Sequence, residues 1–256
     1  MTIAYIFAHF DDEYCALPLI DGALAAGQDQ LFLYVADYDS PRVRAQRHAE
    51  TRRMLAWLGV DPARAVHVGA GSGVADGGVY RALPVAHAAL EAALKGVEVE
   101  AIVCPAWEGG HMDHDMCALL AGRISADRGG VPVDMVSLYN APDLPGPFFH
   151  AGLPLALNGP VRRHTLSARD LARWMLAVRF FWLQRAWIGL WPAMFSTYWR
   201  KGFGVQRLDP ARLRERPHPG RLLYERMFKV PYDEVRAAAD AFLASGSSRP
   251  PRAGRS

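Results

Sequence analysis

The chain has 256 residues, of which 51% are hydrophobic and 21% are charged, and its formal net charge is +3. A chain of this length and composition can bury a sizeable core. This excludes wholesale disorder and indicates one α/β domain, or one domain with a large elaboration. The small positive charge does not by itself indicate a nucleic-acid partner, and we expect none.

The cysteine content and the amino-terminal residues bear on the cellular compartment. Cys15, Cys104 and Cys117 are an odd number without paired spacing, which indicates free thiols in a reducing environment. The first residues, MTIAYIFAHFDDE, contain no basic region or cleavage site, so we predict no signal peptide. Together these features predict a cytoplasmic protein.

Hydrophobic patterning predicts alternating strands and helices over the first 141 residues. The expected strands are residues 3–8, 31–37, 66–69, 99–106 and 133–141. The expected helices are residues 13–26, residues 41–58, an Ala-rich stretch that ends at Gly96, and residues 115–128. Such alternation is typical of a Rossmann-like three-layer sandwich, in which helices cover both faces of a mostly parallel sheet. Ligands bind these sheets outside the carboxyl ends of the strands.

The composition changes at about residue 142, where a Pro- and Gly-rich loop begins. Further on, Ser167 and Asp170 resemble a capping box that opens a helix. A last amphipathic helix is predicted over residues 232–243. We therefore predict three segments, which are a core over 1–141, a helical and aromatic elaboration over 142–244 packed on it within the same domain, and a disordered tail over 245–256.

An acidic turn follows the first predicted strand and contains His9, Asp11, Asp12 and Glu13. Three carboxylates at the mouth of a buried strand repel one another unless a cation compensates them, and a divalent ion would do so. His9 and Asp12 can both reach one ion from a tight turn, which leaves Asp11 free to act as a base. The alternative is an acidic helix N-terminus, where the carboxylates only favour the helix dipole.

A histidine-rich turn follows the predicted strand over 99–106 and contains His111 and His114 after two glycines. Two histidines and one carboxylate make a three-ligand site with an open position for water, as in catalytic zinc centres. The glycines allow a sharp turn, so that His114 can approach an ion held by His9 and Asp12. The alternative is a polar loop with one buried histidine, but two such turns at strand ends favour the metal site.

The two turns together carry a family resemblance. His9-Phe10-Asp11-Asp12-Glu13 and His111-Met112-Asp113-His114 resemble the paired signature of the LmbE/PIG-L-type deacetylases. Arg47-His48-Ala49-Glu50, running to Leu58-Gly59-Val60, is similar to that family's Arg-x-x-Glu and Leu-Gly stretch. The resemblance covers about residues 3 to 140. One departure is Phe10, which stands where the family usually has proline.

The resemblance implies a ligand set and a cofactor. It implies that His9, Asp12 and His114 hold the ion. A site of two histidines and one aspartate accepts Zn²⁺ or Fe²⁺, and we expect Zn²⁺.

The resemblance also implies roles for the remaining site residues. Asp11 would be the general base, and His111 would be a second catalytic group that Asp113 tunes. Arg47 would contact a phosphate or sugar of the substrate, although a surface pair with Glu50 is an alternative.

The reaction expected from these residues is hydrolysis of an N-acetyl group on an N-acetylglucosamine-type amino sugar, either a glycoside, a glycolipid or a lipid-linked sugar. A metal-bound water would be the nucleophile. Hydrolysis of another small amide or ester is an alternative, and so is a non-enzymatic binding module. Asp11 argues against the last, because a mere metal binder would not need it. No Gly-x-Gly-x-x-Gly follows the first strand, which argues against a dinucleotide.

The segment 171–203 is rich in tryptophan and arginine, a composition that suits peripheral contact with a membrane. However, Trp174, Trp182, Trp187 and Trp191 are spread around a helical wheel, whereas an in-plane amphipathic helix segregates them. Burial in the protein, a subunit interface in an oligomer, or the wall of a substrate tunnel are therefore alternatives.

Overall fold

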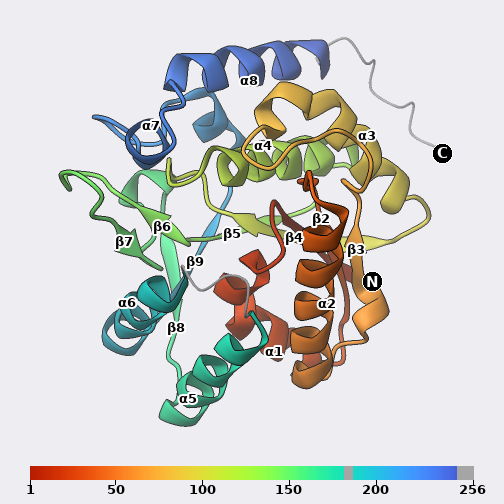
Figure 1. Ribbon diagram of the computed structural model, residues 1–256, viewed down its shortest axis with the longest axis vertical. Helices are drawn as coiled ribbons and strands as arrows, with labels where there is room; N and C mark the ends of the chain where they lie inside the picture. The colour runs from red at the N-terminus through yellow and green to blue at the C-terminus, as the bar shows by residue number, and fades with distance from the viewer. Residues whose placement is uncertain (182–186, 247–256) are drawn as a thin grey trace.

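The protein is described by a computed structural model over residues 1–181 and 187–246, and these residues contain a seven-stranded sheet in the order β3-β2-β1-β4-β5-β9-β8 (Figure 1). The strands are β1 (Thr2–Phe7), β2 (Asp29–Tyr34), β3 (Ala65–His67), β4 (Val99–Pro105), β5 (Val133–Val136), β8 (Val161–His164) and β9 (Phe203–Arg207). The first five are parallel, while β9 is antiparallel to β5 and β8 is antiparallel to β9. The predicted α/β fold with a mostly parallel sheet is confirmed.

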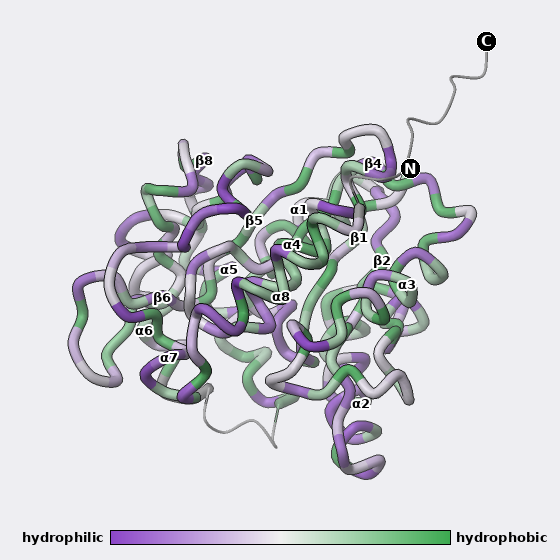
Figure 2. The backbone as a smooth tube through the Cα atoms, turned by 90° about the horizontal axis from the view of Figure 1, so that it is seen from above, coloured by the Kyte–Doolittle hydropathy of each residue, from purple (hydrophilic) through white to green (hydrophobic). Residues whose placement is uncertain are grey.

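Helices cover both faces of this sheet (Figure 1). One face carries α3 (Leu83–Ala93), α4 (Met112–Asp127) and α8 (Tyr232–Gly246), and the other carries α1 (Leu17–Ala25), α2 (Pro41–Leu58), α5 (Ala168–Leu176) and α6 (Trp187–Lys201). Successive side chains of β1 alternate between the two cores, since Ala4 and Ile6 join one and Tyr5 and Phe7 the other. Figure 2 shows hydrophobic segments gathered around β1 and α4, in the middle of the molecule.

Shorter elements complete the described chain. They are the 3-10 helices η1 (Asp12–Ala16), η2 (Pro62–Arg64), η3 (Val79–Ala82), η4 (Ala156–Asn158), η5 (Ala177–Phe180) and η7 (Pro210–Arg214), the helix α7 (Leu223–Met227), and the pair β6 (Tyr139–Asn140) and β7 (His150–Ala151).

The helix predicted over residues 41–58 has the predicted ends. The Ser40 hydroxyl accepts the N–H of Val43, and Gly59 closes the helix with a φ of 105°. The helix predicted over 13–26 is instead divided into η1 and α1. Pro18 explains the division, because an α-helix running through it would need the N–H that proline lacks.

The strand predicted over residues 133–141 is also divided. β5 ends at Val136, and the N–H groups of Leu138 and Tyr139 donate to the Glu108 carboxylate at 2.8 and 3.0 Å. The Ser137 hydroxyl donates to the same carboxylate at 2.6 Å. These backbone groups therefore have a side-chain acceptor in place of a neighbouring strand.

The carboxyl-terminal region extends the sheet, which the sequence did not predict. β8 and β9 are short, and β9 pairs with β5, so the elaboration is more than helical. The predicted cap at Ser167 is confirmed, since its hydroxyl accepts the N–H of Asp170 at 3.1 Å. The division of the chain at residue 141 stays a prediction, and most of the predicted tail, residues 247–256, lies outside the described residues.

The tryptophan-rich segment forms α5, η5 and α6. Trp174 and Trp191 are buried, whereas Trp199 is 65% exposed. Trp182 lies outside the described residues, and so do residues 183–186. None of the helices within residues 1–181 and 187–246 is long and apolar enough to cross a membrane.

Candidate active site

The acidic turn lies at the carboxyl end of β1. One oxygen of Asp12, Oδ2, accepts the N–H groups of Ala8 and His9, both at 2.9 Å. Its other oxygen, Oδ1, lies 3.0 Å from Nε2 of His114. Burial raises the pKa of Asp12, but the two histidines beside it outweigh burial and hold that pKa well below its usual range. Asp12 is therefore a charged, fixed acceptor between the two turns.

Asp11 has a strained backbone beside this carboxylate. Its φ is 109° and its ψ is −15°, a region that costs a residue other than glycine about 1–3 kcal/mol and that often marks functional sites. Its N–H donates to the Glu13 carboxylate at 3.0 Å. Burial, together with the charges of Asp12 and Glu13, raises the pKa of Asp11 well above its ordinary value. Asp11 is therefore a buried carboxylate with increased proton affinity.

The histidine-rich turn connects β4 to α4. Gly110 permits it, because a Cβ on this residue would lie 2.0 Å from the carbonyl oxygen of Tyr139. The Asp115 carboxylate accepts the N–H groups of Glu108 and Gly109, both at 3.0 Å. His111 caps α4, since its Nδ1 accepts the N–H of Asp113 at 3.1 Å. The turn is thus held by side chains on both of its flanks.

The two turns meet because β1 and β4 are adjacent and parallel. The ring centroids of His9, His111 and His114 lie 4.9 to 5.4 Å apart, and one nitrogen of each ring lies within 4.8 Å of the others. Burial lowers the pKa of His111 to about 3, so the imidazole is uncharged at neutral pH. An uncharged imidazole is the form that binds a metal ion.

A third loop contributes Asp76, which the sequence did not single out. Nε2 of His9 lies 3.1 Å from Asp76 and 3.2 Å from Asp113. Asp113 in turn accepts the N–H groups of Gly77 and Val79 at 2.6 and 3.0 Å, which anchors the loop to α4. Asp76 follows β3, so its place at the carboxyl edge of the sheet was the signal that could have identified it.

We expect Asp113→Ala to lower the free energy of unfolding by about 1–3 kcal/mol, because it leaves two N–H groups of the Gly77–Val79 loop without their acceptor. Urea denaturation would measure this loss. The matched control is Asp76→Ala, which removes a carboxylate that contacts the same histidine nitrogen but is 43% exposed, and its effect should stay below about 1 kcal/mol. Equal stabilities of the two variants would contradict the anchoring role of Asp113.

The donor set fits a divalent ion. Among the described residues, two groups have ligand atoms close enough to hold one, namely His9 with His111 and His114, and His9 with Asp76, His111 and Asp113. Imidazole and carboxylate donors suit Zn²⁺ and Fe²⁺. Asp12 belongs to neither group but contacts His114. The predicted ligand set of His9, Asp12 and His114 is therefore brought together, and its use stays a prediction.

Arg47, the predicted substrate contact, lies at the edge of the site. Its guanidinium carbon is 5.0 Å from the centroid of the Tyr38 ring. Burial lowers the pKa of Arg47, but Tyr38, Asp11 and Asp76 outweigh burial and raise it. Arg47 is therefore close enough to Asp11 and Asp76 for their charges to raise its pKa. Its contact with a substrate stays a prediction.

Phe10 is fully buried in an aromatic cluster. Its ring lies 4.9 Å from His48 and 4.8 Å from His67, so it connects the acidic turn to α2 and β3. Its N–H donates to the Tyr38 hydroxyl at 3.1 Å, a bond that a proline could not make. Phe10 therefore serves as a packing anchor beneath the turn.

We expect Phe10→Ala to lower the free energy of unfolding by about 3–5 kcal/mol, the usual cost of truncating a buried phenylalanine. Denaturant titration would measure it. Phe149→Ala, which truncates a ring that is 39% exposed, is the matched control and should cost much less. A loss below about 1 kcal/mol in Phe10→Ala would show that the cluster does not support the turn.

Two aromatic rings that the sequence did not assign to the site lie beside its histidines, one from the carboxyl-terminal elaboration and one from the end of the core segment. The Phe228 ring lies 4.7 Å from His111, and the Tyr139 ring lies 5.6 Å from His114. On the other side, Leu190 and Trp191 of α6 line a cavity of about 10 Å³ together with Asp11. A cavity of that volume is about the size of one water molecule.

A known family resembles the part of the chain that contains this site. Residues 4–125 match the model described as PIG-L, GlcNAc-PI de-N-acetylase. The matched residues include both turns and the aspartate-bearing loop between them. No curated protein matches the chain.

Solved structures share the fold. The zinc-inhibited form of teicoplanin deacetylase Orf2 is 15% identical with a TM-score of 0.61, and the alignment covers 82% of this chain and 98% of that one. N,N'-diacetylchitobiose deacetylase from Pyrococcus horikoshii, complexed with an inhibitor, is 15% identical with a TM-score of 0.56, covering 82% and 85%. A 4-carboxy-2-hydroxymuconate hydratase from Pseudomonas putida KT2440 is 14% identical with a TM-score of 0.51, covering 81% and 95%. Because the fold occurs in a hydratase as well as in deacetylases, it does not decide the reaction. Over residues 4–125, which contain both motifs, the chain matches the family model of the PIG-L de-N-acetylases.

Proposed function

We propose that the protein is a metal-dependent hydrolase that removes the N-acetyl group from an N-acetylglucosamine-type amino sugar. The observation that carries the proposal is the convergence of the two turns. It places one nitrogen each of His9, His111 and His114 within 4.8 Å of one another. The buried carboxylate of Asp11, whose backbone is strained, is close enough for the charge of His9 to affect its pKa. A binding protein would have no need for a carboxylate held in that way.

The ion would be held by His9, Asp12 and His114. When bound, a divalent ion of this kind supplies Lewis acidity and lowers the pKa of water. Zn²⁺ is the ion we propose, with Fe²⁺ as the alternative that the same donors accept.

Asp11 accepts the proton of the attacking water, since its raised pKa gives it the proton affinity of a general base. As the tetrahedral intermediate forms, the charge on its oxygen is stabilised by His111. The C–N bond then breaks as Asp11 or His111 delivers the proton taken from the water to the departing amine, and acetate and the free amino sugar leave. His111 is uncharged in the free protein, so its protonation depends on the negative charge that the intermediate brings.

An acetate-release screen tests the proposal. The panel contains N-acetylglucosamine glycosides with and without lipid aglycones, a simple non-sugar amide, and an ester. Each substrate is assayed with metal-replete and with chelated protein. Zinc-dependent release of acetate from a sugar substrate supports the proposal.

Two outcomes of the screen would contradict it. Turnover of the amide or ester without turnover of any amino sugar would show that the site hydrolyses another class of substrate. Unchanged turnover after chelation, with metal analysis confirming that the ion is gone, would remove the metal from the reaction.

A further inference from the structure

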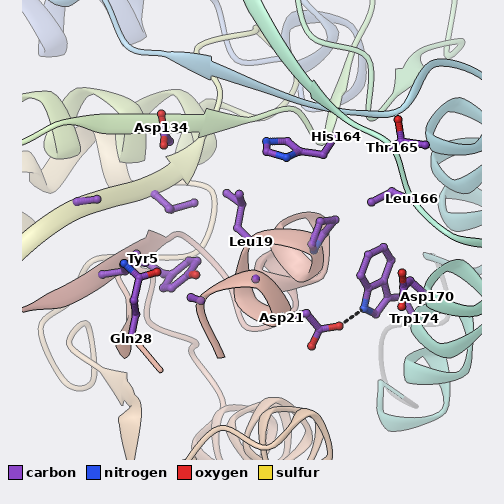
Figure 3. A pocket seen from close by; sticks show the side chains of 16 residues that line it. Tyr5, Leu19, Asp21, Gln28, Asp134, His164, Thr165, Leu166, Asp170 and Trp174 are labelled. Atoms are coloured by element: carbon purple, nitrogen blue, oxygen red, sulfur yellow. Dashed lines mark hydrogen bonds between the residues drawn. The ribbon is translucent and has the colours of Figure 1, made fainter. Parts of the chain in front are cut away.

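We infer that the protein has a second, non-catalytic binding site for an uncharged, hydroxyl-bearing ligand, the chemistry of a sugar unit. The site is a cavity of about 510 Å³ between the sheet, α1 and α5 (Figure 3). This volume is within the range of small-molecule sites. The inference goes beyond the proposed deacetylation and does not depend on it.

The cavity is separate from the candidate active site. Its floor includes Ile3 of β1 and Ala101 of β4, which lie in the amino-terminal halves of their strands. His9 and His111 follow the carboxyl ends of the same two strands. Neither turn of the candidate active site contributes a residue to this cavity.

A buried polar group faces the cavity without a partner. Tyr5 is 0% exposed, and its hydroxyl has no hydrogen-bond partner among the described residues. Figure 3 shows Tyr5, His164 and Trp174 on three sides of the hollow. The Tyr5 ring is stacked on Phe32 with centroids 4.5 Å apart, so a phenylalanine would pack equally well. An unsatisfied buried hydroxyl costs stability, and a ligand that bonds to it would remove that cost.

A glycine in the wall is a second costly feature. Gly22 lies inside α1, and a Cβ placed on it would meet no atom within 4 Å. It does not have the positive φ that requires glycine. Alanine would therefore fit and would stabilise the helix. Gly22 therefore keeps the cavity open at the expense of folding stability, and the Tyr5 hydroxyl likewise carries a stability cost.

The polar groups of the lining favour an uncharged ligand. Three carboxylates line the cavity, Asp21, Asp134 and Asp170, and none of the described lining residues is a lysine or an arginine. An anion such as a phosphate would meet no lysine or arginine in this lining. Arg173 lies 2.6 Å from Asp21, and Arg162 lies 2.7 Å from Asp134, so a cation is not needed to balance these two charges.

The remaining lone pairs can accept hydroxyl groups of a ligand. Gln28, His164 and Thr165 add neutral hydrogen-bonding groups, and the Trp174 indole is fixed by its N–H bond of 2.6 Å to Asp21. Carboxylates and amides around an aromatic and aliphatic surface match a sugar ring, which has hydroxyls at its edge and C–H groups on its faces.

The test uses methyl β-D-glucopyranoside, which has no N-acetyl group to hydrolyse, and the full-length protein with labelled isoleucine methyl groups. Ile3 lines the cavity, whereas Ile124 belongs to the core on the opposite face of the sheet. We expect the sugar to shift the NMR signal of Ile3 but not that of Ile124. Glucose 6-phosphate and glucosamine, the anionic and cationic comparisons, should bind more weakly. Absence of an Ile3 shift, equal shifts of both methyls, or tighter binding of either charged sugar would overturn the inference.

Two variants locate the binding. Tyr5→Phe should lower the affinity for the sugar about fivefold or more, while the Tm of the free protein stays unchanged or rises. Gly22→Leu should fill the cavity and abolish binding, whereas Ala25→Leu, on an exposed position of the same helix, should not. Unaltered affinity in Tyr5→Phe, or equal affinities of the two leucine variants, would overturn the inference.

Discussion

Replacing Asp11 by asparagine should leave the ion in place and lower kcat for acetate release by about 10²–10⁴-fold, the usual contribution of a general base. The amide keeps the size of the carboxylate but cannot accept a proton. The buried position and raised pKa of Asp11 fit that role. Metal content per chain and kcat, measured on the same preparation, would check the expectation.

The control for this variant is Asp39→Asn, which changes an aspartate in the loop before α2 whose side chain is exposed. It should retain wild-type kcat and metal content. Retained activity in Asp11→Asn would exclude Asp11 as the base. Loss of the ion in that variant would instead make Asp11 a ligand.

Asp12→Asn and His114→Gln should each lower the affinity for Zn²⁺ by more than about 100-fold, because removing a direct ligand should cost more than the 10–100-fold typical of outer partners. Activity should fall with the ion content. Competition with a chelator of known affinity would measure the loss, and circular dichroism would confirm that each variant folds.

His111→Gln is the matched comparison, because it distinguishes the two arrangements that the geometry permits. If His9, Asp12 and His114 hold the ion, His111→Gln keeps Zn²⁺ but loses catalysis. If the three neighbouring histidines hold it, His111→Gln loses the ion and Asp12→Asn keeps most of it. The second result would contradict the predicted ligand set.

Local sequence patterns were sufficient to predict several elements of the fold. The helix α2 has the ends predicted for it, because Ser40 and Gly59 satisfy its terminal groups through neighbouring residues alone. β1 was predictable for a similar reason, since an apolar run bounded by polar residues must be buried on both faces. Elements whose partners are distant were not predictable. β8 and β9 are only four and five residues long, and only their pairing in the sheet identifies them.

The candidate site likewise has some residues that local sequence could identify and others that it could not. Both turns could be located because their residues are close in sequence and follow predicted strands. Asp76 was missed, since a single aspartate in a glycine-rich loop has no motif and only its position after β3 pointed to it. The strand order β3-β2-β1-β4 brings its loop to His9. Phe10 was unexplained for the same reason, because its ring packs against His48 and His67, far along the chain.

The sequence by itself therefore determined the α/β fold and the two turns that carry the metal-binding chemistry, because patterning and motif spacing are local properties. The tertiary structure alone decided how those turns meet. It also decided that Asp113 anchors the Asp76 loop, that rings of the elaboration border the site, and that a cavity opens beside Tyr5. These features depend on contacts between residues tens to more than a hundred positions apart, and such contacts exist only once the sheet has ordered its strands.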